Sequence, residues 1–174
     1  MIETCEIISQ PYSGEYEEVI YDNENPWNSS DWSYIKFTDS AFKEWCGVFR
    51  GFPKKTAISK IRKEIIILTS DYLWKLNQED GKPIEFEDQP HYKELTVSPN
   101  GDFIIADYYN ICRISDSIKS KIEIKSPIQM DMIEFREWHD GKLSIKCDEF
   151  ANWDNHLELE LEDKTWKIEV KNAI

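Results

Sequence analysis

Three histidines are the side chains whose ordinary pKa lies closest to neutral pH, so they are the first candidates for acid–base chemistry. His91 lies in an acidic loop, His139 precedes an Asp-Gly turn, and His156 opens an alternating segment. A hydrolase would need one of them beside a nucleophile and an orienting carboxylate. Cys147 with His156 is the one such pair that neighbouring strands could bring together. Exposed turn histidines are the simpler interpretation of all three.

Metal and phosphate sites are not indicated by the spacing of the residues. The segments "YDNEN" and "CDEFANWDN" are rich in Asp and Asn but lack the ligand spacing of a calcium-binding loop. The segment "EWCGVFRG" has two glycines, but no Lys-Ser or Lys-Thr follows them, so it is not a phosphate-binding loop. We therefore predict no catalytic residue, no metal and no cofactor, and we expect the chain not to be an enzyme.

The four cysteines, Cys5, Cys46, Cys112 and Cys147, are scattered and include no Cys-x-x-Cys pair. No segment reaches the roughly 20 apolar residues of a membrane span, and the acidic start "MIETCEII" is unlike an export signal. We expect a cytoplasmic protein with reduced, mostly buried cysteines. Cys112, flanked by Ile111 and Ile114 in its strand, should react slowly with thiol reagents.

The elements are indicated by a repeated pattern of turns and short apolar runs. In "SPNGDFIIADYYNICRIS", residues 98–115, Asn100-Gly101 predicts a tight hairpin turn, because Gly and Asn tolerate the positive φ that such turns need. The run "FIIA" after it is typical of a strand buried on both faces. A second turn at "DYYN" and a third strand at "ICRI" complete the unit.

The same unit occurs upstream and downstream. The apolar runs at 65–68, 103–106 and 143–145 are predicted as central strands, and their starts lie 38 and 40 residues apart. Asp80-Gly81 and Asp140-Gly141 provide further turns. Downstream, Leu157, Leu159 and Leu161 alternate with glutamates, as in a strand with one buried face. A period near forty with about four strands per unit is the spacing of propeller blades.

The chain resembles a β-propeller over about residues 56–170, and "SPNGDFIIA" is similar to the strand-turn-strand phrase of a WD-repeat blade. The Gly-His and Trp-Asp dipeptides of that family are missing from the blade positions, so no functional residue is carried over. We predict an all-β antiparallel meander of repeated three- to four-stranded units, forming a propeller-like ring or an incomplete one. A β-sandwich is the alternative.

We expect one domain spanning 1–174, with repeat units at 56–92, 93–131 and 132–170. Residues 1–55 would hold an irregular arm plus a degenerate first unit, in which "WSYIKF" and "EWCGVFRGF" provide strands. The arm is expected to be extended and packed by Trp27 and Trp32, or to be a long surface loop. A helix over 39–45, with an N-cap at Asp39 or Ser40, is the one non-β element predicted.

The strongest global property is charge. The chain has 34 Asp and Glu against 21 Lys and Arg, a formal net charge of −13. Such a surface repels nucleic acid and anionic membranes, and it favours a basic protein partner. Ordinary solubility is the competing explanation of the acidity. The oligomeric state is open.

Two function classes follow from these properties. The first is a non-catalytic protein-binding domain; in size, acidity and lack of catalytic motif the chain is similar to bacterial toxin immunity proteins, which implies a basic toxin as partner. The second is a small-ligand-binding or hydrolytic β-protein whose site is assembled across strands. For the first class, the predicted partner-binding residues are turn and loop tryptophans and acidic residues of the arm: Trp27, Trp32, Trp138, Trp153, Glu15, Glu17 and Glu18.

Overall fold

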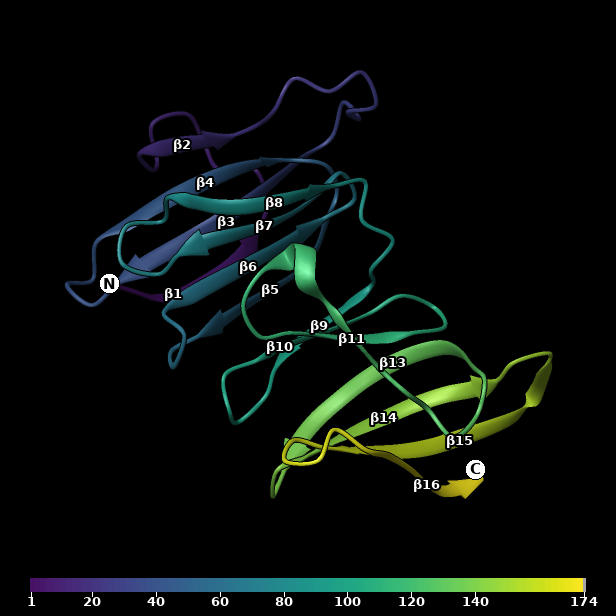
Figure 1. Ribbon diagram of the computed structural model, residues 1–174. Helices are drawn as coiled ribbons and strands as arrows, with labels where there is room; N and C mark the ends of the chain where they lie inside the picture. Colours follow the sequence, from purple (N-terminus) through teal and green to yellow (C-terminus); the bar gives the residue numbers. More distant parts are fainter. Residues whose placement is uncertain (174) are drawn as a thin grey trace. The chain divides into compact units, whose positions relative to one another are not determined.

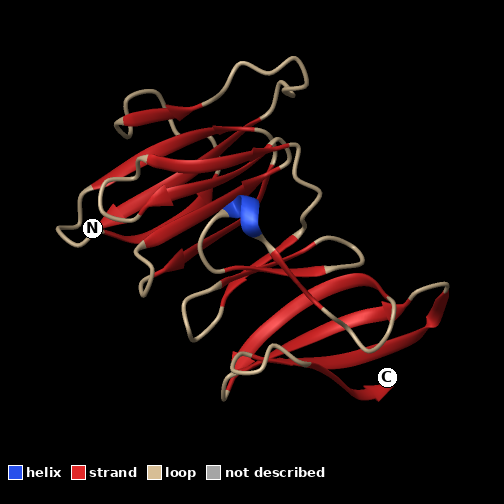
Figure 2. Ribbon diagram, in the orientation of Figure 1, coloured by secondary structure: helices blue, strands red, loops and turns tan. Residues whose placement is uncertain are grey.

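The computed structural model describes residues 1–173, and its regular elements are almost all strands, joined by loops and turns (Figures 1 and 2). Within these residues the strands form four separate sheets of four strands each, and one short 3-10 helix is present. The predicted all-β fold of repeated units is confirmed. Contacts divide the chain into two compact units, unit 1 from Met1 to His91 and unit 2 from Tyr92 to the C-terminus. The prediction of one domain over 1–174 stays a prediction.

The second sheet of unit 1 is a simple antiparallel meander. Its strands follow the chain order: β5 (Pro53–Ser59), β6 (Glu64–Thr69), β7 (Tyr72–Asn77) and β8 (Pro83–Asp88). The apolar run of β6 explains its central place, because Ile65, Ile66 and Ile67 are fully buried. Burying one such side chain contributes about 1.5–3 kcal/mol.

The first sheet of unit 1 departs from this pattern. Its strands are β1 (Ile2–Ile8), β2 (Glu18–Tyr21), β3 (Trp32–Asp39) and β4 (Glu44–Arg50), in the order β1-β3-β4-β2. The strand β3 contains the predicted segment "WSYIKF", and β4 contains "EWCGVFRGF" except for its last two residues. The outermost strand, β2, pairs with β4 in parallel, the one parallel pair among the described strands. The edge strand β2 therefore pairs with β4, a strand that comes after β3 in the chain.

Unit 2 contains two antiparallel meanders. The third sheet consists of β9 (Glu94–Val97), β10 (Phe103–Ala106), β11 (Ile111–Ile114) and β12 (Ile122–Ile124), with the 3-10 helix Ile118–Ser120 before β12. The fourth consists of β13 (Met130–His139), β14 (Lys142–Glu149), β15 (Asn152–Glu162) and β16 (Ile168–Ala173). The three predicted central strands lie in β6, β10 and β14. They belong to three different sheets and not to one flat sheet.

Each unit has its own hydrophobic cluster. In unit 1, aromatic side chains of the first sheet pack on β6 and β7, with Tyr21 stacked on Phe49 at 4.2 Å between ring centroids. In unit 2, aliphatic side chains from β10 to β16 form the cluster. The predicted alternation in β15 is confirmed, because Leu157, Leu159 and Leu161 are buried and belong to this cluster.

The two dipeptide turns of unit 2 are both hairpins, as predicted, but they differ in type. Asp140 and Gly141 both have positive φ, 48° and 77°, and form a two-residue turn between His139 and Lys142. At the other turn only Gly101 has positive φ, 88°. Its amide donates to the carbonyl of Ser98 at 2.8 Å in a longer loop. Asn100 therefore does not need the left-handed conformation expected of it.

The predicted helix over 39–45 is wrong, because this segment is the hairpin turn between β3 and β4. The Asp39 carboxylate accepts hydrogen bonds from the amides of Ala41 (2.8 Å) and Lys43 (2.9 Å), and Phe42 has a φ of 60°. An Asp that caps a helix and an Asp that closes a turn use the same side-chain-to-amide hydrogen bond. The local residue preference could not separate the two.

Candidate functional site

The acidic arm, defined here as residues 9–31, is fixed in unit 1 by polar contacts. It contains six carboxylates and no Lys or Arg. The Tyr72 hydroxyl donates to Asn28 Oδ1 at 2.6 Å, and the Ser29 amide donates to Asp71 Oδ2 at 2.6 Å. Asp22 pairs with Arg50 at 2.5 Å. The expectation that tryptophans pack the arm is wrong for Trp27, whose side chain is 78% exposed.

The three predicted glutamates lie in the exposed part of this arm. Glu15 accepts a hydrogen bond from the Tyr12 amide at 2.8 Å, closing a turn before β2. Glu17 pairs with Lys43 at 3.1 Å, and both side chains are well exposed. Glu18 is the first residue of β2 and is exposed. All three carboxylates are therefore accessible to a partner along one short stretch of chain.

The two predicted tryptophans of unit 1 have different surroundings. The Trp27 side chain is exposed, and its backbone accepts a hydrogen bond from the Gln89 side chain and donates one to the Asn25 side chain. Trp32 begins β3, and the Arg50 guanidinium lies 3.6 Å from its ring centroid. Since Asp22 binds the same guanidinium, Trp32 and Asp22 together hold an arginine. Hydrogen bonding to Asp22 raises the pKa of Arg50 above its ordinary value.

The other two predicted tryptophans belong to unit 2. Trp138 lies in β13, is partly buried against the unit 2 cluster, and donates from Nε1 to Thr96 Oγ1 at 3.1 Å. Its place is explained by packing and this hydrogen bond. Trp153 lies in β15, but its side chain falls outside the described part of the structure. The partner-binding role of all seven residues stays a prediction.

A groove of about 290 Å³ lies beside β2 in unit 1, and sequence reasoning missed it. Its apolar lining comes from Val19, Ile20, Tyr21, Trp45 and Pro83. Ile20 is 67% exposed. The apolar "VIY" of β2 is the signal that could have indicated it, because exposed apolar residues in an acidic segment need an explanation.

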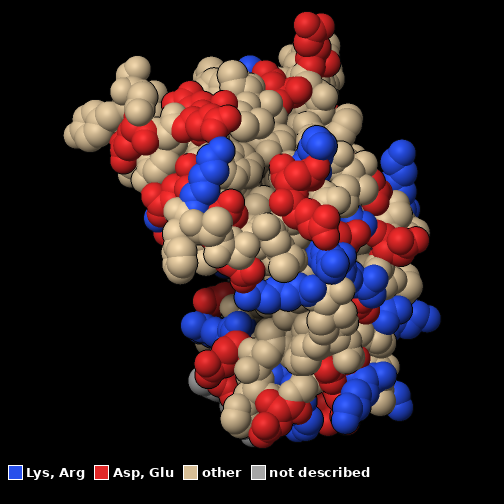
Figure 3. Space-filling model, turned by 90° about the vertical axis from the view of Figure 1, so that its left-hand side faces the viewer, with Lys and Arg blue, Asp and Glu red and all other residues tan. Residues whose placement is uncertain are grey.

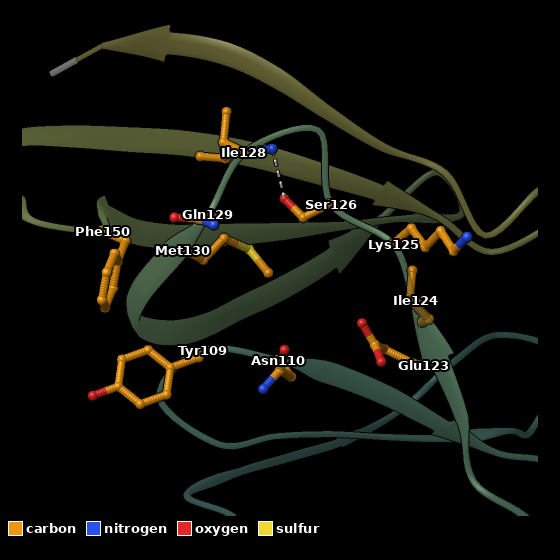
Figure 4. A pocket seen from close by; sticks show the side chains of 10 residues that line it. All are labelled: Tyr109, Asn110, Glu123, Ile124, Lys125, Ser126, Ile128, Gln129, Met130 and Phe150. Atoms are coloured by element: carbon orange, nitrogen blue, oxygen red, sulfur yellow. Dashed lines mark hydrogen bonds between the residues drawn. The ribbon is translucent and has the colours of Figure 1, made fainter.

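A second pocket, of about 490 Å³, lies in unit 2 (Figure 4). The rings of Tyr109 and Phe150 stand at one end of it, in an edge-to-face contact with centroids 5.9 Å apart. The Glu123 carboxylate and the Asn110 amide lie along another side, whereas the Lys125 ammonium points away. Aromatic rings with amide and carboxylate groups nearby can bind a small polar ligand. No histidine lines the pocket.

The Cys147–His156 pair is not a nucleophilic site. In the β14–β15 ladder Cys147 lies opposite Leu157 and is buried, whereas His156 lies opposite Asp148 and bonds to its carboxylate at 2.6 Å. Adjacent strand positions point to opposite faces, so the two side chains are separated by the sheet. Burial raises the pKa of the Cys147 thiol to about 11, which disfavours the thiolate.

The other cysteines differ in burial. Cys46 is buried, whereas Cys5 and Cys112 are half-buried. Burial raises the pKa of Cys5 to about 11. The four cysteines all lie within the described residues, and no disulfide joins them. Cys112 thus lies less deeply than its neighbours Ile111 and Ile114, which are fully buried.

The charge is distributed in groups over the surface. Figure 3 shows one face, on which acidic side chains lie in patches with lysines and arginines between them. No group of three or more His, Cys, Asp or Glu residues able to hold a metal occurs among residues 1–173. In the same part of the chain no helix is long and apolar enough to cross a membrane.

Comparison with known proteins bears on the fold. No model of a known protein family matches the sequence, and no curated protein is significantly similar to it. Among solved structures, the N-terminal domain of Nup159, a β-propeller, is similar with a TM-score of 0.50 at 7% sequence identity. The alignment covers 71% of this chain and 34% of that domain. The fold is propeller-like. At this identity the similarity carries no site residue or activity, and the chain spans about a third of the length of the domain it matches.

Proposed function

We propose that this protein is a non-catalytic, cytoplasmic protein-binding domain whose acidic arm captures a basic partner. The observation that carries the proposal is the composition and exposure of the arm. Its six carboxylates occur without any Lys or Arg, and among them Tyr12, Ile20 and Trp27 expose most of their side chains. Exposed apolar groups beside one sign of charge are typical of a surface that binds a charged protein.

The contact between Arg50, Asp22 and Trp32 supports a basic partner in particular. Within the chain, a carboxylate and an indole ring already hold one guanidinium. Glu15, Glu18 and the exposed Trp27 offer the same two kinds of group without an ion pair among the described residues. Exposed carboxylates steer a basic protein toward this surface and raise its association rate, while buried aromatic anchors govern dissociation.

A narrower form of the proposal is an immunity-type protein that neutralises a basic toxin. Its support is the general character of the chain: 174 residues, a net charge of −13, and no recognisable catalytic motif. A toxin-like reading frame directly upstream of the gene would favour this form.

The test uses the partner recovered with the intact protein. The association rate is measured at low and high ionic strength, for the wild type and for the triple variant Glu15→Gln, Glu17→Gln, Glu18→Gln. We expect salt to slow association several-fold with little change in dissociation, because screening weakens long-range steering more than contact packing. The triple variant should reproduce part of this effect.

The matched control is the triple variant Glu134→Gln, Glu137→Gln, Glu169→Gln in unit 2, which removes the same charge from other exposed positions. It should slow association less. An association rate that is indifferent to salt would contradict electrostatic capture. Equal effects of the two triple variants would show that net charge matters and the arm does not.

The pocket of unit 2 favours a second candidate function, the binding of a small ligand such as a sugar. The support is the pair of half-exposed rings, Tyr109 and Phe150, next to the Glu123 carboxylate. Ligand-detected NMR with simple saccharides would test it. Loss of a signal on Tyr109→Ala would support the site, and the absence of any binding saccharide would count against it.

A further inference from the structure

The strand β2 leaves one edge of its sheet open. It is the last strand in the order β1-β3-β4-β2, and its four residues pair in parallel with Cys46 to Phe49 on one side only. An edge strand carries a row of backbone N–H and C=O groups that another extended segment can pair with. Strand addition to such an edge is a common mode of peptide recognition.

The side chains of β2 do not protect this edge in the usual way. Edge strands are typically blocked by lysines, prolines or bulges, and "EVIY" has none of these. Val19 and Ile20 are both exposed, and the charge that precedes them is negative throughout, at Glu15, Glu17 and Glu18. Carboxylates at this edge repel a second copy of this acidic chain but not a basic segment.

The groove beside β2 has an aromatic floor that is held in place. The Tyr21 hydroxyl donates to the Gly81 carbonyl at 2.8 Å, and the Trp45 ring stacks on Phe37 at 4.2 Å. Gly81 has a φ of 70°, and a Cβ at this position would lie 3.0 Å from the Trp45 ring. Gly81 is therefore in close contact with both Tyr21 and Trp45, and a larger residue there would press on them.

The rim of the groove already binds ammonium groups. Glu17 holds Lys43 at 3.1 Å, and Asp80 holds Lys82 at 2.8 Å. All four residues line the groove, and both lysine side chains are mostly exposed. Exposed ion pairs of this kind contribute only about 0–1 kcal/mol each, so a partner's basic side chain can replace either lysine at little cost.

We infer that the open edge of β2 and the groove beside it are the docking site for an extended segment, rich in Lys and Arg, of a partner protein. The segment adds to β2 as a fifth strand. One of its basic side chains lies over Trp45, with Glu17 or Asp80 beside it, an arrangement that combines a cation–π contact with an ion pair. Apolar side chains of the segment, on the opposite face of the added strand, cover Ile20. This inference rests on the proposed function and gives it a surface and a binding mode.

Synthetic peptides separate strand addition from simple charge attraction. The probe is a peptide of alternating Lys and Val. A second peptide has the same number of Lys residues but two Pro between successive Lys, so that Pro falls on both edges of the extended chain and interrupts any ladder. A third has Glu in place of Lys. Binding to the intact protein is measured by titration, and the backbone amides of β2 are followed by NMR hydrogen exchange.

We expect the Lys-Val peptide to bind at least about tenfold more tightly than the Lys-Pro peptide, a difference of about 1.4 kcal/mol. The Glu-Val peptide should not bind. Amides of β2 should become more protected from exchange on binding, whereas amides of β12, the edge strand of the third sheet, should not change.

Variants locate the site. Ile20→Lys places a cation on the edge and should weaken Lys-Val binding about tenfold or more. The matched control is Ile122→Lys, on the edge strand β12 of unit 2, where the isoleucine is also exposed. It should leave binding unchanged. Gly81→Ala, which presses on the groove floor, should also weaken binding, with its folding checked by circular dichroism.

The outcomes distinguish this inference from the proposed function. Equal binding of the Lys-Val and Lys-Pro peptides, or equal effects of Ile20→Lys and Ile122→Lys, would overturn strand addition at β2. Salt-dependent capture of the intact partner would still stand in that case. Failure of every peptide to bind at millimolar concentration would also overturn the inference. Salt-independent association of the intact partner would instead remove the proposed function, whatever the peptides do.

Discussion

Each unit contains a three-residue ion network of Lys and Glu. In unit 1 a lysine lies between two glutamates, and in unit 2 a glutamate lies between two lysines. In unit 1, Lys75 lies between Glu64 (2.9 Å) and Glu85 (3.4 Å), and only 3% of its side chain is exposed. In unit 2, Glu160 lies between Lys142 (3.2 Å) and Lys171 (2.8 Å), with 31% of its side chain exposed. Burial makes a lost partner costly, whereas solvent compensates an exposed group. We therefore expect similar charge patterns to stabilise the two units by very different amounts.

The edges of the sheets differ between the units in a related way. In unit 2 every outermost strand pairs with a strand next to it in chain order, and all pairs are antiparallel. In unit 1 the outermost strand β2 comes from the arm, before its neighbour β4 is formed. The repeated strand pattern accounts for the antiparallel sheets. The proposed binding surface lies at β2, the strand that departs from this pattern.

The largest expected effect tests whether the two units form one domain. Ile67 belongs to the unit 1 cluster and Leu159 to the unit 2 cluster, and both are buried. Replacing either by Ala should lower the free energy of unfolding by about 2–5 kcal/mol through lost burial and a cavity. We expect each variant to shift a single transition in urea, as for a domain of this size. Two transitions, of which each variant shifts only its own, would show that the units are separate domains.

The next effect tests the comparison of the ion networks. Lys75→Met removes the ammonium between two glutamates. It should lower the free energy of unfolding by about 3 kcal/mol, because breaking a buried ion pair leaves the carboxylates without a counter-charge. Glu160→Gln should cost less than about 1 kcal/mol. Urea unfolding of both variants measures the difference.

A compensating variant checks that the uncompensated carboxylates cause this loss of stability. Lys75→Met combined with Glu64→Gln and Glu85→Gln should recover much of the loss, because neutral side chains need no counter-charge. If Lys75→Met and Glu160→Gln lowered the free energy of unfolding equally, the difference in burial would not determine how much each network stabilises its unit.

The strands and turns were predictable because their signals are local. A continuous apolar run such as 65–68 and a dipeptide such as Asp140-Gly141 state their conformation within a few residues. The 39–45 segment was mispredicted because Asp39 can close a turn or cap a helix with the same hydrogen bond.

The candidate sites were predictable only in part because they depend on distant pairing. The place of the arm in the chain and its charge are visible in the sequence, and so are Glu15, Glu17 and Glu18. The groove needs Tyr21 beside Gly81, sixty residues later, and the parallel pairing of β2 with β4. Likewise, Tyr109 and Phe150 meet only through the packing of two sheets. Contacts of this kind have no local signature.

The smallest expected effect compares one tryptophan from each unit. Trp138→Phe removes a hydrogen bond to Thr96 in a partly buried place and should lower the free energy of unfolding by about 1 kcal/mol. Trp27→Phe should change it by less than about 0.5 kcal/mol, because the Trp27 side chain is exposed and the hydrogen bonds of its backbone do not depend on the ring. Binding of the recovered partner should show the reverse order, with Trp27→Phe weakening it and Trp138→Phe leaving it unchanged. An anchor that does not stabilise the free protein is retained for what it contacts in the complex, so this reversal separates an anchor from a core residue. If Trp138→Phe weakened binding more than Trp27→Phe, the binding surface would belong to unit 2, and the acidic arm would be reduced to a source of net charge.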